Sequence, residues 1–503
     1  MGRGLGVRPS RRAKAAAALL VCGLLAASLT ACMTGDRVHG AFTREFSRDP
    51  AVVSMDLSSA DNMPFTGGVG GEVVLRDDIS DAELRDFTER VRAFAADQPG
   101  PDTAGGDGAG STAGTSSRVR VTVLYDSWRI PVLADESQGA ALLDVFGELS
   151  RDPRVRGGGF TSRDFTTAVD SARIEVTDGP AVFDLLAGQQ QVFAALAKAP
   201  RLTVATDASP ESNSEPVERI VVEGTPGAWL DAAAATYASL RAAIPLAAFE
   251  ADASAVSVTL AQESDLGKAR EISRALLPGG DSAVAFQSDV VTLFPGAHGD
   301  AARALLAELP ARDRARVATV WTDDRALQLG VADEPAVAEE PGSAGAPGSA
   351  QRQGSADKQG SAALAELARA VAGTSAAEAF ETLELRSGDP REPALAVRSA
   401  PRNLEVLAAT AVGLGDRDEV ARVQLSPGTS LEIAVSARPA ADDLTSYAAA
   451  LKPVAVPGDR VCIDAGTTGS FCVIAAAKLT AAELNERATR EGAAFIEAWN
   501  AQR

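Results

Sequence analysis

Short β-branched runs alternate with alanine-rich amphipathic segments along most of this chain. One such unit has a strand at residues 173–176, an apolar helix face through Phe183, Leu186 and Phe193, and a second strand at 201–204. Period-2 runs of this kind predict half-buried strands, and apolar positions spaced three or four apart predict helices packed on them. The pattern therefore predicts repeated strand–helix–strand units.

The opening strands of these units recur at a regular interval. Those near 173, 218, 256, 290 and 327 lie 45, 38, 34 and 37 residues apart, and those near 395 and 431 lie 36 apart. The wider gap from 327 to 395 is one unit enlarged by a low-complexity insertion. A fixed period of this length is typical of a chain built from one repeated supersecondary unit.

About two strands per helix decide the predicted architecture, because a doubly wound parallel sheet has about one. Residues 286–290 leave room only for a tight hairpin between strands. We therefore expect an α+β fold of tandem ferredoxin-like, split βαβ repeats, with antiparallel sheets covered by helices on one face. A solenoid of stacked βαβ units is the alternative. A final helix from Thr480, with Leu484, Phe495, Ile496 and Trp499, should dock on this body.

Composition shifts divide the chain into five segments. Low-complexity sequence predicts disordered loops at 98–117 and 335–361. Residues 33–70 lack a periodic apolar pattern and end in a glycine-rich run. The resulting segments are a leader (1–31), a flexible tether (32–70), a first repeat domain (71–250), a second repeat domain (251–477) and a C-terminal helix (478–503). Ser80 and Glu83 have the spacing of a helix capping box.

The charge of the chain excludes one class of partner. The 503 residues include 46% hydrophobic and 23% charged side chains, which indicates a globular protein, and the formal net charge is −20. Removal of the five leader cations would bring it to about −25. Such a surface repels phosphates, so we expect no nucleic-acid partner.

The sequence offers few groups for catalysis. Its two histidines are His39, in the predicted tether, and His298, in a predicted strand-to-helix loop, and neither has a triad or metal-ligand partner nearby. Residues 464–470 (DAGTTGS) resemble the phosphate-binding hairpin of the sugar-kinase and actin-like ATPase family, but that hairpin opens its fold, whereas this one lies near the C-terminus. We expect a simple turn there, no metal or cofactor, and a non-enzymatic protein.

Cys462 and Cys472 flank that turn. A hairpin turning at 466–469 would place the two cysteines opposite one another, which predicts a disulfide. Two free buried thiols are the alternative.

Binding proteins for sugars and peptides often expose aromatic side chains. Most tryptophans here fall in periodic core positions. Trp128, which follows Tyr125 at a predicted strand break, is the candidate for a binding surface.

The first residues have the pattern of an export signal. Arg3, Arg8, Arg11, Arg12 and Lys14 precede an apolar run from 15 to 29, and the run ends in Leu29, Thr30, Ala31 and Cys32. This ending resembles the lipobox of the bacterial lipoprotein signal family. The resemblance implies that Cys32 carries diacylglycerol, that the leader is cut before it, and that the protein is anchored at the extracytoplasmic face of the cell membrane. An ordinary secretory peptide is the alternative, and the absence of an apolar pair after Arg12 favours general secretion over twin-arginine export.

These observations predict a lipid-anchored, non-enzymatic scaffold or binding protein of the cell envelope. Its expected partners are the membrane, through the lipid, and an envelope protein or cell-wall component. The alternative is a solute-binding lipoprotein of a transport system, for which two parallel-sheet lobes are expected.

Overall fold

A computed structural model describes residues 34–60, 68–98, 119–165, 167–206, 218–277, 283–332, 353–388, 392–466, 469–480 and 489–502. The leader, Cys32 and nearly all of the predicted loop at 98–117 lie outside these ranges. The chain divides into two compact units, Met1–Ala238 with Ala248–Val256 and Ser239–Ala247 with Ser257–Arg503. The domain boundary predicted after residue 250 lies in the stretch where these segments alternate.

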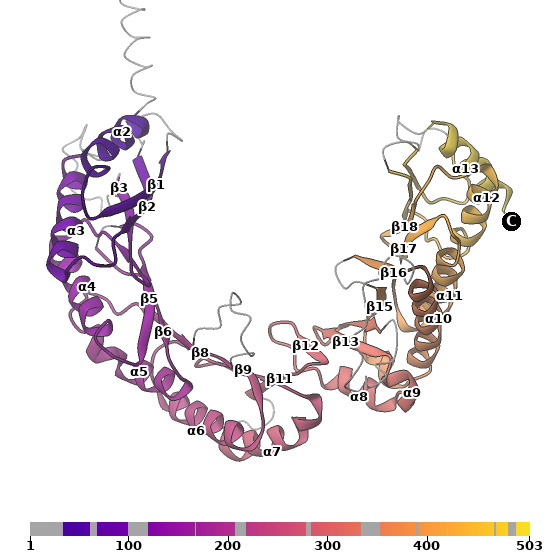
Figure 1. Cartoon of the computed structure of the whole chain (residues 1–503). Helices are drawn as coiled ribbons and strands as arrows, with labels where there is room; N and C mark the ends of the chain where they lie inside the picture. Colours follow the sequence, from indigo (N-terminus) through magenta and orange to yellow (C-terminus); the bar gives the residue numbers. More distant parts are fainter. Residues whose placement is uncertain are drawn as a thin grey trace, which may run out of the picture. The chain divides into compact units, whose positions relative to one another are not determined.

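The first sheet has eleven strands in sequential order, from β1 to β11. Its strands are β1 (Val52–Ala60), β2 (Gly68–Leu75), β3 (Val119–Tyr125), β4 (Trp128–Pro131), β5 (Val155–Thr161), β6 (Ser171–Val176), β7 (Arg201–Thr206), β8 (Arg219–Glu223), β9 (Leu246–Ala251), β10 (Val256–Leu260) and β11 (Val284–Gln287). The helices in this part of the chain are α2 (Thr34–Phe46), α3 (Asp81–Ala96), α4 (Glu136–Leu149), α5 (Gly179–Val192), α6 (Ala228–Ala243) and α7 (Leu266–Leu276). Figure 1 gives their positions along the chain.

The second sheet has nine strands, again in sequential order, from β12 to β20. They are β12 (Val291–Leu293), β13 (Val317–Thr322), β14 (Ala326–Val331), β15 (Thr382–Gly388), β16 (Pro393–Ser399), β17 (Val420–Ser426), β18 (Ser430–Val435), β19 (Arg460–Asp464) and β20 (Phe471–Ile474). The accompanying helices are α8 (Asp300–Glu308), α9 (Ala311–Arg314), α10 (Gln353–Ala372), α11 (Leu404–Gly415), α12 (Ala441–Leu451) and α13 (Thr489–Ala501).

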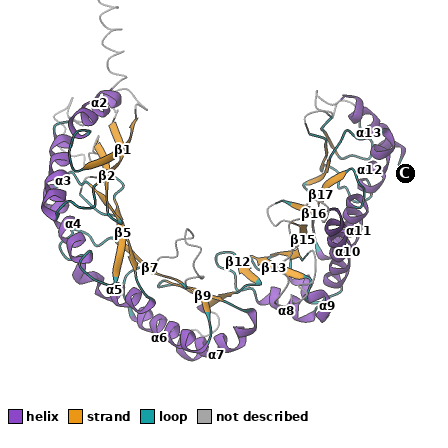
Figure 2. Cartoon of the chain, in the orientation of Figure 1, coloured by secondary structure: helices purple, strands orange, loops and turns teal. Residues whose placement is uncertain are grey.

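Strand direction follows the connection between neighbours. Strands joined through a helix are parallel, as in β2–β3 and β14–β15, and strands joined by a short turn are antiparallel, as in β3–β4 and β15–β16. Helices lie along one side of the strands within each unit (Figure 2). The predicted α+β class, with repeated βαβ units and helix-covered sheets, is therefore confirmed.

The pairing differs from the expected split βαβ pattern in one respect. In a split unit another strand lies between the two strands that flank the helix, whereas here those two strands are direct neighbours. Both sheets are consequently mixed rather than antiparallel. Strand order depends on long-range pairing, which hydrophobic periodicity does not encode.

The tight hairpin predicted at 286–290 is instead the turn at which the two sheets separate. Ser288 donates its backbone N–H to Val291 O (2.9 Å), and the Ser288 hydroxyl accepts the N–H groups of Val290 and Val291 at 3.2 and 2.9 Å. Gln287 Oε1 accepts the N–H of Leu293 at 3.3 Å. Side-chain acceptors therefore satisfy amides that a ladder between β11 and β12 would otherwise use.

The prediction of a flexible tether at 32–70 is wrong for the described residues of that range. Helix α2 and strand β1 occupy it, and β1 pairs with β2 over its length. Val38, Phe42 and Phe46 are buried, and the two phenylalanine rings contact Phe87 and Phe94 of α3. Their four-residue spacing places them on one helical face, so this segment is part of the folded body.

The second predicted loop also differs from expectation, because α10 begins at Gln353, inside the range 335–361. Residues 333–352 lie outside the described part of the chain. By contrast, the capping box is confirmed: the Ser80 N–H donates to Glu83 Oε2 at 2.7 Å, and Ser80 Oγ accepts the Glu83 N–H at 3.3 Å.

The C-terminal helix docks as predicted. In α13, Phe495 and Trp499 are buried, and the Trp499 indole donates to Ala476 O at 2.9 Å. Lys452 Nζ, from the end of α12, donates to the carbonyls of Trp499 and Gln502 at 2.9 and 2.7 Å. This cation satisfies carbonyl groups that the helix end leaves without intrahelical partners. Leu484, named with this helix, lies outside the described residues.

Candidate functional site

The nine-stranded sheet buries one face and leaves the other accessible. Leu327, Leu329 and Val331 of β14 are buried, whereas the residues between them are half-buried, and β15 and β18 show the same alternation. Successive side chains of a strand point to opposite faces. We call the accessible side the open face; the buried side belongs to one core cluster that runs from Val291 to Trp499.

Strand pairing places five residues of the open face in a row that runs across strands β12 to β16. Trp321 lies opposite Thr292 of β12 and Gln328 of β14, Gln328 opposite Glu384 of β15, and Glu384 opposite Arg398 of β16. The row is polar except for Trp321, whose exposed fraction is 37%.

A second exposed ring lies beside Trp321. Phe294 follows β12 directly, is 52% exposed, and donates its N–H to Thr322 O at 2.9 Å as a continuation of the ladder. Because Thr292 is opposite Trp321, Phe294 lies on the same face one strand away and two residues further along. We call Phe294 and Trp321 the aromatic patch.

The loop that carries Phe294 is fixed by the β13–β14 turn. Asp324, in the left-handed region at φ 69°, accepts the backbone N–H groups of His298 and Gly299 at 2.7 and 2.8 Å. Asp323 accepts the N–H groups of Ala326 and Arg325, and these bonds lower the pKa of its carboxyl group. The segment that carries Phe294 is therefore held by its backbone hydrogen bond to Thr322 and by the bonds that the Asp324 carboxylate accepts from the following loop.

His298 lies exposed in the loop between β12 and α8, as predicted. Among the described residues, no group of three or more His, Cys, Asp or Glu could hold a metal ion.

On the accessible face of each sheet, arginines and acidic residues occur in similar numbers, although the chain as a whole is acidic. On the first sheet the accessible positions carry Arg–Glu pairs, with Arg219–Glu250 at 2.8 Å and Arg173–Glu175 at 3.7 Å, and also Arg129–Glu72 and Arg201–Glu223. On the second sheet Glu384 and Arg386 pair at 2.6 Å. The other charged residues of that open face are Arg398, Arg422, Glu432, Arg460 and Asp464.

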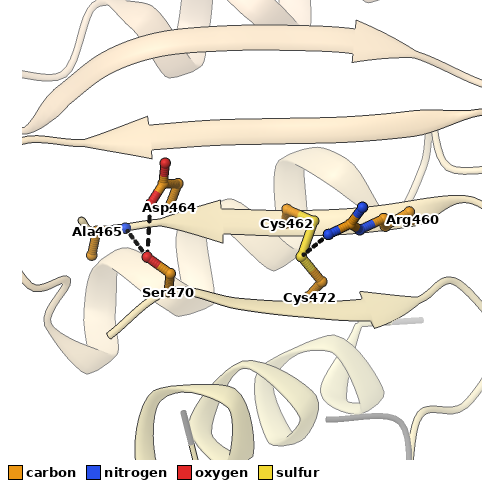
Figure 3. The surroundings of a disulfide bond; sticks show 6 residues. All are labelled: Arg460, Cys462, Asp464, Ala465, Ser470 and Cys472. Carbon is orange, nitrogen blue, oxygen red and sulfur yellow. Dashed lines mark hydrogen bonds between the residues drawn. A yellow bond between two sulfur atoms is a disulfide. The ribbon is translucent and has the colours of Figure 1, made fainter. Parts of the chain in front are cut away.

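The predicted disulfide is present. Cys462 and Cys472 are direct partners across the β19–β20 hairpin, with Cα atoms 4.1 Å apart. Figure 3 shows Arg460 beside the disulfide, where its guanidinium donates to Cys472 Sγ at 3.4 Å. This geometry favours the disulfide over two free thiols.

The turn of that hairpin is closed by its own side chains. Ser470 Oγ donates to Asp464 Oδ1 at 2.7 Å and accepts the Ala465 N–H at 3.0 Å (Figure 3). The hydrogen bond from Ser470, followed by that from the Gly466 N–H, lowers the pKa of Asp464. These contacts favour a self-contained turn over a phosphate-binding loop. Thr467 and Thr468 lie outside the described residues.

Trp128 does not form the binding surface considered for it. Its exposed fraction is 3%, and its ring contacts Phe146 and stacks on Phe160. It is a core residue, placed there by the alternation of β4, in which Ile130 is also buried. The periodic pattern that predicts core positions for most tryptophans includes Trp321. Its neighbours Val320 and Thr322 are the buried ones, and this local alternation is the signal that places Trp321 outside.

Cavities in the described part of the first unit include one with a mainly apolar lining and one lined by several charged residues. One, of about 210 Å³, lies between α3 and α4, and its rim includes Arg92, which pairs with Glu89 and with Glu136. Another, of about 370 Å³, is lined by Asp49 and Arg90, whose side chains are 2.6 Å apart.

No helix in the described ranges is long and apolar enough to cross a membrane. Searches of family models, curated proteins and solved structures found no match to this chain.

Proposed function

We propose that this protein is a lipid-anchored lipoprotein of the extracytoplasmic face, attached through Cys32, and that it acts as a non-enzymatic scaffold or binding protein of the cell envelope. The observation that carries the binding role is an accessible sheet face with balanced charge and an exposed aromatic patch, in a chain whose net charge is −20. Exposed apolar groups rimmed by polar ones are typical of interaction surfaces.

The lipobox supports the anchor, and the fold adds a geometric consequence. Helix α2 begins at Thr34, two residues after Cys32. Two residues span at most roughly 7 Å. An acyl group on Cys32 would therefore attach the folded body close to the membrane surface, without a long linker.

The solute-binding alternative predicts two lobes with parallel sheets. Both sheets here are mixed and sequentially ordered, so we favour the scaffold or binding role.

Membrane fractionation tests the anchor. We expect Cys32→Ala to move the protein from the membrane fraction to the soluble extracytoplasmic fraction, because the acyl chain supplies the free energy of membrane binding. Mass spectrometry of the wild-type N-terminal peptide should show the lipid, and Cys22→Ala is the matched control. Unchanged fractionation of Cys32→Ala would refute the anchor. Cross-linking in the native envelope, followed by affinity purification, then identifies the partner.

A further inference from the structure

The only aromatic side chains exposed by more than about a third in the described ranges, Phe294 and Trp321, are diagonal neighbours on the open face, because Trp321 pairs with Thr292, two residues before Phe294. The other described tryptophans and phenylalanines are buried or half-buried. Exposed rings of this size leave apolar surface in water that a ligand can cover. Two such rings on neighbouring strand ends indicate a surface that a ligand covers.

We propose that the aromatic patch binds a β-1,4-linked glycan, with one pyranose ring stacked on Trp321. The inference rests on the proposed binding role and names the ligand class of that surface. The π face of an aromatic ring carries negative charge density, which attracts the polarised C–H groups on the face of a sugar ring.

The surroundings of Trp321 fit a sugar better than an apolar peptide side chain. Thr292 and Gln328 in the same row supply hydroxyl and amide groups, and Glu384, which also pairs with Arg386 at 2.6 Å, supplies a carboxylate. Groups of these kinds can bond the hydroxyl groups at the edge of a sugar ring. These flanking groups are polar, so an apolar side chain on the patch would find no further apolar wall to complete its burial.

The shape and charge of the row favour an extended, uncharged polymer. From Trp321 to Arg398 the row crosses three strand spacings, or roughly 14 Å, which exceeds one sugar ring. A straight row on an open sheet matches the extended chain of β-1,4-linked pyranoses rather than a coiled α-linked one. Arginines and acidic residues of the open face occur in similar numbers, and the net charge of the chain is −20, so an uncharged ligand is favoured over a polyanion.

Calorimetric titration of the purified full chain tests the proposal, with cellohexaose and hexa-N-acetylchitohexaose as probes and α-linked maltohexaose as the comparison. We expect at least one β-linked probe to bind more tightly than maltohexaose. Trp321→Ala should weaken that binding about tenfold or more, which is about 1.4 kcal/mol. Phe294→Ala should weaken it less, and Val406→Ala, whose side chain is 61% exposed on α11, should leave it unchanged.

Circular dichroism and the melting temperature show whether each variant is folded. Because Trp321 and Phe294 are exposed, we expect melting temperatures close to wild type. In the wild type, bound probe should also protect Trp321 from fluorescence quenching by acrylamide. The proposal is overturned if neither β-linked probe binds, or if folded Trp321→Ala binds like wild type. A protein partner from envelope cross-linking, together with membrane release of Cys32→Ala, would in that case leave the proposed function standing.

Discussion

At the scale of single residues, Gly158 in β5 lies where no side chain fits. A Cβ atom built there would be 2.4 Å from Arg173 O and 3.0 Å from the Trp128 ring. By contrast, Gly188 in α5 has nothing within 4 Å of such an atom. The two glycines therefore form a matched pair for one substitution.

We predict opposite effects of alanine at these positions. Gly158→Ala should lower the free energy of unfolding by about 1–3 kcal/mol, because β5 and β6 must separate or the Trp128 ring must move. Gly188→Ala should raise it by about 0.5–1 kcal/mol, because alanine is the better helix former. Urea unfolding followed by circular dichroism measures both. Equal stability of the two variants would contradict the contact assigned to Gly158.

The residue-scale part of the candidate site was only partly predictable from sequence. Cys462, Cys472 and Ser80 were identified because each relation is local, a hairpin pair or a cap, and needs no tertiary contact. For Trp128 and Trp321 the expectation is the reverse of the structure. The sequence singles out Trp128, which is buried, as the candidate for a surface position and predicts a core position for Trp321, which is exposed. Both follow β-rich runs, and the burial of each depends on which strand face meets the helices.

At the scale of elements, the β19–β20 hairpin is held both by backbone pairing of its strands and by a disulfide. Four residue pairs hold the strands in register, and the disulfide links one of these pairs on the open face. Cys462 is buried at 8% exposure, while Cys472 is half-buried.

We predict that Cys462→Ser leaves one thiol, at Cys472, that reacts with a thiol reagent in the folded protein. The variant in which both cysteines are serine should lose about 2–3 kcal/mol of stability, since the bond closes a short loop in the unfolded chain. Intact-mass measurement after alkylation counts the thiols. Unreduced wild type that is alkylated at Cys462 or Cys472 after denaturation would show that the bond does not form.

Elements with regular patterns were predicted well. The opening strands expected near 173, 218, 256 and 327 are found as β6, β8, β10 and β14. Helix α2 was missed although Val38, Phe42 and Phe46 recur every four residues. Its polar residues and glycines dilute the pattern, and the helix is completed by packing against α3.

At the scale of the whole molecule, repeated βαβ units explain both the sequential strand order and the single covered face. A helical crossover returns each parallel strand to the next position in the sheet, and a short turn then adds an antiparallel neighbour. Every unit thus adds its helix to the same side. The sequence could not predict this pairing, because a split and an unsplit unit share the same order of elements along the chain.

The division into two compact units leads to the last prediction. Ile174 of β6 lies in one unit and Ile433 of β18 in the other. Both side chains lie on the covered face, with exposed fractions of 1% or less. Replacing either with alanine should cost about 2–5 kcal/mol, through lost burial and a cavity. In repeat architectures such a change acts mainly on neighbouring repeats. Trp128 and Trp499 report on the two units separately, since each is buried in its own.

In proteins that retain only Trp128 or only Trp499, urea unfolding followed by fluorescence should separate these effects. Ile174→Ala should lower the urea midpoint reported by Trp128 and leave that reported by Trp499 nearly unchanged, and Ile433→Ala should do the reverse. The Trp128 and Trp499 proteins without the isoleucine change are the controls. If either substitution shifts both midpoints equally, the two units unfold as one cooperative body, and the covered faces act as a single core.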